Sequence, residues 1–152
     1  MQWLNLSYKQ FDKAREHFVR FFRRHGDKRI TREGILWIRH TNQKDFEKPG
    51  TLVHCVVDNK TIVGILIISN YGMEESLMAV HTKYRNKDIA QQMVKNSIEL
   101  LGKVYGRVAI DNAPSLKVCF HNGLVAFDLF EGPTGKPTFW LGGGNWSKED
   151  VK

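Results

Sequence analysis

Residues 77–94, LMAVHTKYRNKDIAQQMV, decide the fold of this 152-residue chain. The first four are a continuous apolar run, typical of a central strand that is covered on both faces. A short basic turn follows, and from Lys87 onwards apolar side chains such as Ile89 and Met93 recur at helical spacing. The first amides of such a helix lack intrahelical partners and lie at the positive end of its dipole, so this segment can hold a phosphate group. An ordinary basic surface connection fits the spacing equally well.

The apolar pattern on either side of this segment predicts further helices and strands. Residues 7–25 are expected to be helical because Phe11, Phe18 and Phe22 lie on one stripe. Residues 30–50 contain either a short buried strand or a turn of helix. Further strands are expected over 51–57, 61–69, 75–80, 107–111, 125–130 and 138–141, further helices over 87–104 and 115–122, and a late turn over 132–135. Gly102 or Gly106 is expected to end the first of these two helices. This order predicts an α/β fold with a mixed sheet that helices cover on both faces.

Composition indicates a globular protein of one domain. Apolar residues make up 41% and charged residues 26% of the chain. No run approaches the ~20 apolar residues of a membrane span, and the opening MQWLNLSYKQ lacks the regions of a signal peptide, so we expect a cytoplasmic protein. Cys55 and Cys119 are flanked by apolar residues, which fits buried thiols in a reducing compartment. No histidine stands at metal-ligand spacing beside a cysteine, so no metal is expected.

Positive charge is concentrated near the N-terminus. The net charge is +7, and the first 32 residues hold nine Lys or Arg against three acids. This excess could attract nucleic acid, an acidic protein or the phosphates of a cofactor. A solvated helix face is the other interpretation of the same pattern.

The segment over residues 77–94 resembles the acetyl-CoA-binding motif of the GNAT acetyltransferase superfamily. Val80, Arg85 and Ala90 occupy three key positions of that motif, and Asp88 stands where the family usually has Gly. The family fold is a mostly antiparallel central sheet with helices on both faces. The resemblance implies a variable helical acceptor region over 1–50, a sheet and CoA-binding core over 51–141, and a flexible tail over 142–152. It assigns acetyl-CoA binding, through the pantetheine arm and the pyrophosphate, to Met78, Ala79, Val80, Arg85, Asn86, Lys87, Asp88, Ile89 and Ala90.

Asp88 is the departure that matters most. Gly allows the closest backbone approach to a phosphate, whereas an inward-pointing carboxylate repels one. An outward-pointing carboxylate, screened by Lys83 or Lys87, is favourable in the first turn of a helix. We therefore expect weakened rather than abolished acetyl-CoA binding.

The resemblance continues after the motif. Asn112 stands where the family has an Asn that hydrogen-bonds the cofactor arm, and Gly123 matches a Gly that follows the next helix. Four residues before this Gly the family often has a Tyr, which protonates the leaving thiolate, and here that position is Cys119. A thiol with an ordinary pKa of about 8.5 can donate a proton. A buried packing cysteine is the other interpretation.

The resemblance also suggests a general base. Glu74 lies six residues before Val80, where some family members carry a catalytic Glu. Burial beside the cleft would raise the pKa of such a carboxyl group toward neutrality. Glu74 could equally be a loop acid. His81 and Asp111 are further candidates, and His81 has an ordinary pKa suited to neutral pH.

These observations predict an N-acetyltransferase that moves an acetyl group from acetyl-CoA to a primary amine by direct attack. The alternative is an inactive protein of the same fold, which contacts nucleic acid or an acidic partner through its basic N-terminal helix. The expected partners are acetyl-CoA and an amine acceptor, with no membrane, and the chain is expected to be a monomer or homodimer.

Overall fold

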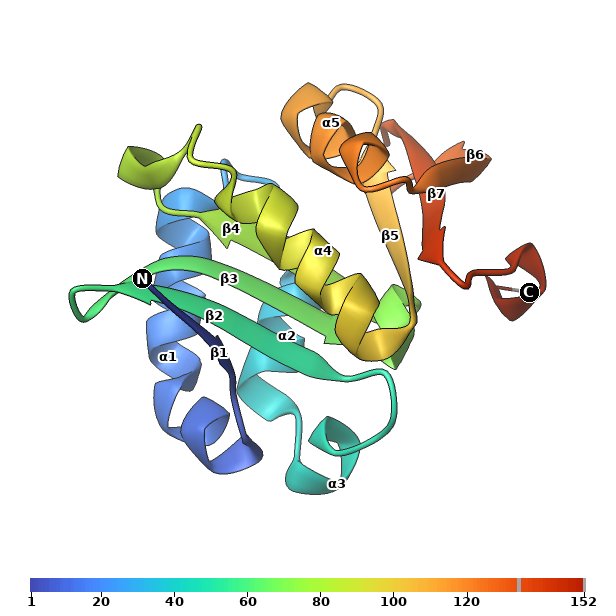
Figure 1. The fold of residues 1–152 in the computed structure, drawn as a ribbon. Coiled ribbons are helices and arrows are strands. Elements are labelled where there is room, and N and C mark those ends of the chain that lie inside the picture. The colour runs from blue at the N-terminus through green and yellow to red at the C-terminus, as the bar shows by residue number, and fades with distance from the viewer. Residues whose placement is uncertain (134, 152) are drawn as a thin grey trace.

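The computed structural model describes residues 1–133 and 135–151, so Thr134 of the expected late turn and Lys152 of the expected tail lie outside it. The described strands form two antiparallel sheets, which stand side by side with helices packed around them (Figure 1). The mixed α/β fold with helices on both faces, predicted above, is confirmed. No described helix combines the length and apolar character needed to cross a membrane.

The first sheet has the order β1-β2-β3-β4. Its strands are β1 (Gln2–Asn5), β2 (Leu52–Asp58), β3 (Thr61–Ser69) and β4 (Glu75–Val80). The last three agree with the predicted strands to within a residue at each end. Strand β1 lies inside the region that was expected to be helical, and it pairs antiparallel with β2.

Three helices cover one face of this sheet. They are α1 (Tyr8–His25), α2 (Arg32–His40) and α3 (Gln43–Phe46). Helix α1 confirms the predicted helix, and a capping box between Ser7 and Gln10 fixes its first turn. Its buried residues Phe11 and Phe18 pack into a core with residues of β2, β3 and β4. Residues 30–50, for which either a short strand or a turn of helix was expected, are therefore mainly helical.

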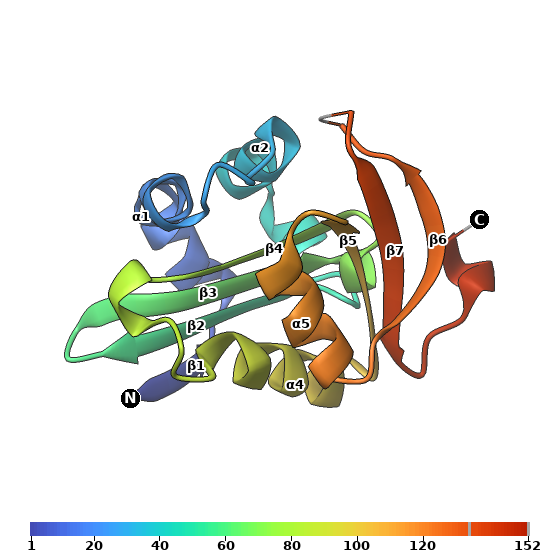
Figure 2. The same cartoon turned by 90° about the horizontal axis from the view of Figure 1, so that it is seen from above.

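Helices α4 (Ile89–Leu101) and α5 (Ala113–His121) lie on the opposite side from α1 and α2 (Figure 2). Met93 of α4 is fully buried in a second core, which Val56 of β2 joins. Helix α4 was expected to continue to residue 104, but it ends at Gly102, whose φ of 84° leaves the helical region. Helix α5 begins after Asn112, earlier than the expected start at residue 115.

The second sheet has the order β5-β7-β6. Its strands are β5 (Lys103–Ala109), β6 (Val125–Glu131) and β7 (Pro137–Gly144). Strand β5 starts four residues earlier than predicted, because the chain turns directly after Gly102. The expected flexible tail also needs correction: Gly142–Gly144 are the end of β7 and pair with Lys103–Tyr105.

The two sheets meet where β4 and β5 begin. The hydroxyl group of Tyr105 accepts a hydrogen bond from the amide of Ser147, which fixes the chain after β7 against β5. Gly72 lies against the backbone of Tyr105, and Arg107 Nη2 donates to the carbonyl oxygen of Glu74 at 3.0 Å. From this contact β4 and β5 diverge (Figure 1).

Candidate active site

The divergence of β4 and β5 leaves one edge of β4 without a partner among the described strands. The amide of His81 donates to Val63 of β3 at 2.8 Å, so alternate residues before it, such as Ala79, also direct their backbone groups to β3. The backbone groups of Met78 and Val80 therefore point to the open edge. An extended ligand arm could pair with this edge as a strand does.

The turn after β4 leads from this edge to the start of α4. Asn86 and Asp88 both have positive φ angles, 68° and 59°. Helix α4 has 13 residues, and Asp88 precedes it without making a side-chain capping hydrogen bond. The amides of the first turn, including those of Ile89 and Ala90, are thus not capped by that side chain, and they lie at the positive end of the helix dipole.

Asp88 has the backbone conformation that Gly adopts most easily. Its φ of 59° and ψ of 20° lie in the left-handed region, which Asp tolerates better than most residues. The turn therefore keeps its shape without Gly, and the difference that Asp88 introduces is a side chain and a negative charge. Its side chain is exposed beside exposed Lys87, whose ammonium group lies 5.5 Å from the centre of the Tyr84 ring.

Removing this charge is expected to strengthen acetyl-CoA binding. Asp88→Asn tolerates the same backbone conformation without the charge, so a repulsion of about 1 kcal/mol would translate into a roughly fivefold lower Kd. Asp88→Gly should give at least the same gain. Calorimetric titration of acetyl-CoA into the three proteins measures the effect. Equal affinity for all three proteins would show that the carboxylate does not face the pyrophosphate.

Arg85 connects the turn to the end of α1. Its guanidinium group donates to the carbonyl oxygen of His25 and to the carboxylate of Asp27, both at 2.8 Å, and to the carbonyl oxygen of Val80 at 3.3 Å. Arg85 was predicted to help bind the pyrophosphate. In the structure its hydrogen bonds hold the loop after α1 against the end of β4, and the contact with pyrophosphate stays a prediction.

Two histidines pack together beside Arg85. The centres of the His25 and His81 rings are 4.2 Å apart. Nδ1 of His25 accepts from the amide of Thr82 at 3.2 Å, and Nδ1 of His81 accepts from the amide of Lys83 at 3.1 Å. Burial and the nearby His81 lower the pKa of His25, and burial with nearby cations lowers the pKa of His81. Both rings are therefore favoured in the neutral form.

Acidification is expected to destabilise the fold through these rings and through His54, whose pKa is also lowered by burial. The histidines of the unfolded chain bind protons below about pH 6.5, whereas the same histidines in the folded chain bind them only at lower pH. Their contribution to the free energy of unfolding is therefore complete above that pH and is lost as the pH falls. Urea unfolding between about pH 7 and pH 5 measures the slope of the free energy of unfolding against pH. His25→Gln should make it shallower, and His40→Gln, at an exposed position, serves as the control. An unchanged slope in His25→Gln would remove His25 from the explanation.

The segment after β5 holds two further predicted residues just before α5. Asn112 is half-buried at the start of α5, and no capping hydrogen bond occupies its side chain. The carboxylate of Asp111 lies 2.8 Å from Lys136 and 3.1 Å from Arg29. Hydrogen bonds from these two cations lower the pKa of Asp111, which makes it a weak base.

Two adjacent carboxyl groups stand at the start of β4. Glu74 is exposed, and its Oε1 accepts hydrogen bonds from Trp37 Nε1 at 3.2 Å and from the hydroxyl group of Ser69. Glu75 is only 9% exposed. Burial raises the pKa of Glu75, and the neighbouring carboxylates raise it further, against the lowering effect of Arg107. The sequence pointed to Glu74 as the base and did not single out Glu75.

The comparisons with known proteins agree with this geometry. A family model described as the acetyltransferase (GNAT) family matches residues 11–120. The chain belongs to the GNAT acetyltransferase family. A ribosomal-protein-S5-alanine acetyltransferase from Vibrio fischeri is similar in structure, with a TM-score of 0.70 and 16% identity over 95% of this chain and 92% of that one. A spermidine N-acetyltransferase variant from Vibrio cholerae has a TM-score of 0.61 and 14% identity over 95% of each chain. A search of curated proteins found no match.

Cys119, the proton donor predicted above, is a buried thiol. It is 7% exposed within the second core, and burial raises its pKa to about 11. At neutral pH the thiol is protonated, but its raised pKa makes it a weaker acid than an ordinary thiol and therefore a poorer proton donor to a leaving thiolate. Its burial among Val118, Leu124 and other apolar residues of that core equally fits a packing role.

Proposed function

We propose that this GNAT protein transfers an acetyl group from acetyl-CoA to a primary amine. The observation that carries the proposal is the continuous path from the open edge of β4 to the start of α4, which has no side-chain cap. The backbone of Met78 and Val80 would bind the pantetheine arm. The amides that begin with Ile89 and Ala90 would bind the pyrophosphate, and the side chain of Asn112 would bind the arm from the opposite side.

The proposed reaction is a direct attack. The amine nitrogen forms a bond with the carbonyl carbon of the thioester, the bond from that carbon to sulfur breaks, and the CoA sulfur leaves as a thiolate. A carboxylate at the start of β4, Glu74 or Glu75, takes the proton of the amine through water. Cys119 or solvent returns a proton to the thiolate. Burial raises the pKa of Glu75, and a shift in this direction favours the first step because a base becomes more effective as its pKa approaches the working pH.

Titration of acetyl-CoA into the purified protein is the first test. A Kd near 1 μM, about −8 kcal/mol, would support the proposal. A panel of small amines, polyamines and peptides with free N-termini would then identify the acceptor. Acetyl-CoA binding without transfer to any member of the panel would oppose catalysis. Binding by Asp88→Gly alone would favour an inactive GNAT protein whose cofactor site Asp88 has closed.

The cytoplasmic location and the monomeric or dimeric state stay predictions.

A further inference from the structure

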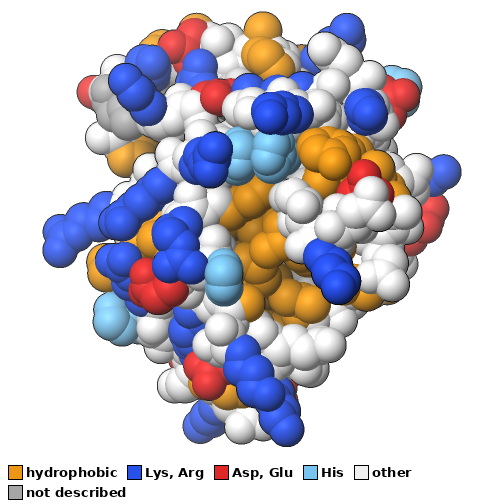
Figure 3. Space-filling model, turned by 90° about the vertical axis from the view of Figure 1, so that its left-hand side faces the viewer, with side chains coloured by type: hydrophobic (Ala, Val, Ile, Leu, Met, Phe, Trp, Pro, Cys, Tyr) orange, Lys and Arg blue, Asp and Glu red, His pale blue; other side chains and the backbone are white. Residues whose placement is uncertain are grey.

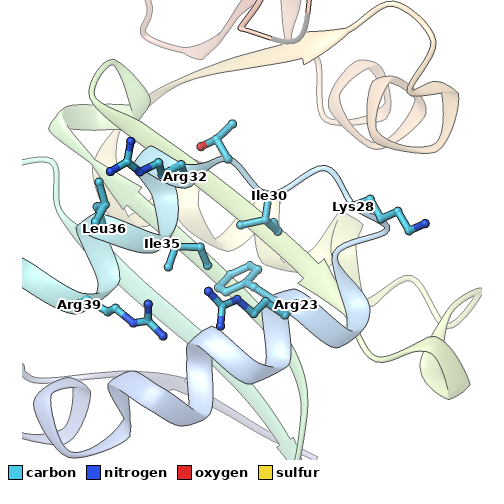
Figure 4. Close-up of a pocket in the computed structure, with 9 residues that line it drawn as sticks. Arg23, Lys28, Ile30, Arg32, Ile35, Leu36 and Arg39 are labelled. Atoms are coloured by element: carbon cyan, nitrogen blue, oxygen red, sulfur yellow. The ribbon is translucent and has the colours of Figure 1, made fainter.

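A hollow lies between α1 and α2 on the outer side of the helical layer. Its volume is about 440 Å³, and Figure 4 shows its lining side chains. The floor is apolar and includes Phe22, Ile30 and Ile35. Four cations line the hollow, Arg23, Lys28, Arg32 and Arg39, and none of its described lining residues is an acid. Figure 4 shows the guanidinium groups of Arg23 and Arg39 near each other and Lys28 pointing away from them.

Three of these four cations make no ion pair with a described residue, although Glu16 lies near enough to Arg23 for that charge to lower the pKa of Glu16. Arg39 pairs with Glu16, whose carboxylate it contacts at 3.0 Å and 3.3 Å. In the part of the chain that the structure describes, no carboxylate lies within ion-pair distance of Arg23, Lys28 or Arg32. Figure 3 shows Lys and Arg side chains gathered along the left of the face that it draws, with Asp and Glu side chains among them. The hollow therefore attracts a negatively charged ligand and repels a polyamine.

The same helix links the hollow to the proposed reaction site. Leu36 of α2 lines the hollow and is 39% exposed, and the next residue, Trp37, donates a hydrogen bond to Glu74. Two consecutive residues of α2 therefore connect the hollow with the start of β4. A ligand seated in it could extend to the carboxylates that are proposed to accept the proton.

The form of the hollow favours a peptide over a nucleic acid. Proteins that bind single strands combine a basic groove with aromatic rings on which bases stack. The Phe22 ring is 1% exposed and cannot serve in this way. Guanidinium groups above an apolar floor suit a carboxylate next to an apolar side chain, since Arg binds carboxylates through paired hydrogen bonds. We propose that the hollow between α1 and α2 binds an acidic segment of a peptide acceptor.

The acceptor role in this inference rests on the proposed acetyl transfer, whereas peptide binding can be tested separately. The probe is an eight-residue peptide with a free N-terminus, two Glu, two Leu and a fluorescent label at its C-terminus. The reference peptide carries Gln in place of both Glu. Anisotropy titration compares the native protein with Arg23→Glu/Arg32→Glu. Lys9→Glu/Lys13→Glu changes the net charge equally at exposed positions of α1 outside the hollow, so it is the matched control.

We expect the acidic peptide to bind at least ten times more tightly than the Gln peptide. Its Kd should rise at least tenfold in Arg23→Glu/Arg32→Glu and less than twofold in the control. Equal losses in both variants, or no preference for Glu, would overturn the inference. Tighter binding of a single-stranded oligonucleotide, lost in the same variant, would overturn it in favour of nucleic acid. If Arg23→Glu/Arg32→Glu does not fold, Arg23→Gln/Arg32→Gln replaces it, with Lys9→Gln/Lys13→Gln as control.

The failure of one proposal can be told from the failure of the other. Acetylation of both peptides at equal rates, with equal affinity, would leave the transfer reaction standing and remove the anion site. Preferential binding of the acidic peptide, lost in Arg23→Glu/Arg32→Glu, without acetylation of any amine would support the site and remove the transfer reaction.

Discussion

Glu75→Gln is expected to lower kcat for acetyl transfer by about 100-fold or more, the usual contribution of a general base. The carboxyl group of Glu75 is buried, its pKa is raised, and it stands where β4 and β5 meet. Gln has nearly the same shape but cannot accept the proton. The KM for acetyl-CoA should change little, because the proposed cofactor contacts are at the other end of β4. Steady-state kinetics with a saturating amine measures both quantities.

Glu74→Gln is the matched variant for this experiment. An amide oxygen at residue 74 can still accept the hydrogen bonds from Trp37 and Ser69, so we expect less than a tenfold change in kcat. The opposite order of effects would return the role of base to Glu74.

Thermal unfolding of Glu75→Gln tests whether this variant stays folded, so that a lower kcat is not caused by unfolding. A buried carboxyl group with a raised pKa lowers the free energy of unfolding of the protein as the pH rises through that pKa. A neutral amide does not titrate, so Glu75→Gln should be at least as stable as the native protein at alkaline pH.

Much of the fold could be predicted because its elements are strongly patterned. The Phe stripe of α1 and the apolar runs of β3 and β4 indicate their own structure. Strand β1 carries no such pattern, because its four residues are all exposed and it exists only by pairing with β2. The end of α4 was only partly predictable. The apolar spacing runs on past Leu101, and the positive φ of Gly102 shows that Gly102, rather than Gly106, ends the helix.

The local structure of the candidate site was predictable where its residues are contiguous in sequence. The turn from Val80 to Ala90 carries the family motif within a few residues, and the structure forms a strand, a turn and a helix there. Contacts between distant segments had no such signal. The link from Arg85 to Asp27 joins residues far apart in the chain, and so does the ion pair from Arg29 to Asp111. The burial of Glu75 also depends on packing, because adjacent residues of a strand face opposite sides and the sequence does not say which acid is covered.

Gly72→Ala is expected to destabilise the protein by about 3 kcal/mol or more, the range of a severe clash with the backbone. A Cβ atom at this position would lie 1.8 Å from the carbonyl oxygen of Tyr105, and the φ of +100° is itself unfavourable for a side chain. Neither the strand that contains Tyr105 nor the turn can move without separating the two sheets. For a chain of this size the melting temperature should fall by about 6–12 °C. Thermal unfolding followed by circular dichroism measures the shift.

Gly102→Ala separates the two causes of this effect. Gly102 has a similar positive φ of +84°, but a Cβ atom there would meet nothing within 4 Å. The control variant should therefore lose only about 1 kcal/mol, the backbone contribution alone. Equal losses in the two variants would show that backbone conformation, rather than the contact with Tyr105, makes Gly72 necessary. If the contact dominates, Gly72→Ala should also weaken acetyl-CoA binding, because the junction it disturbs sets how far β4 and β5 diverge along the proposed cofactor site.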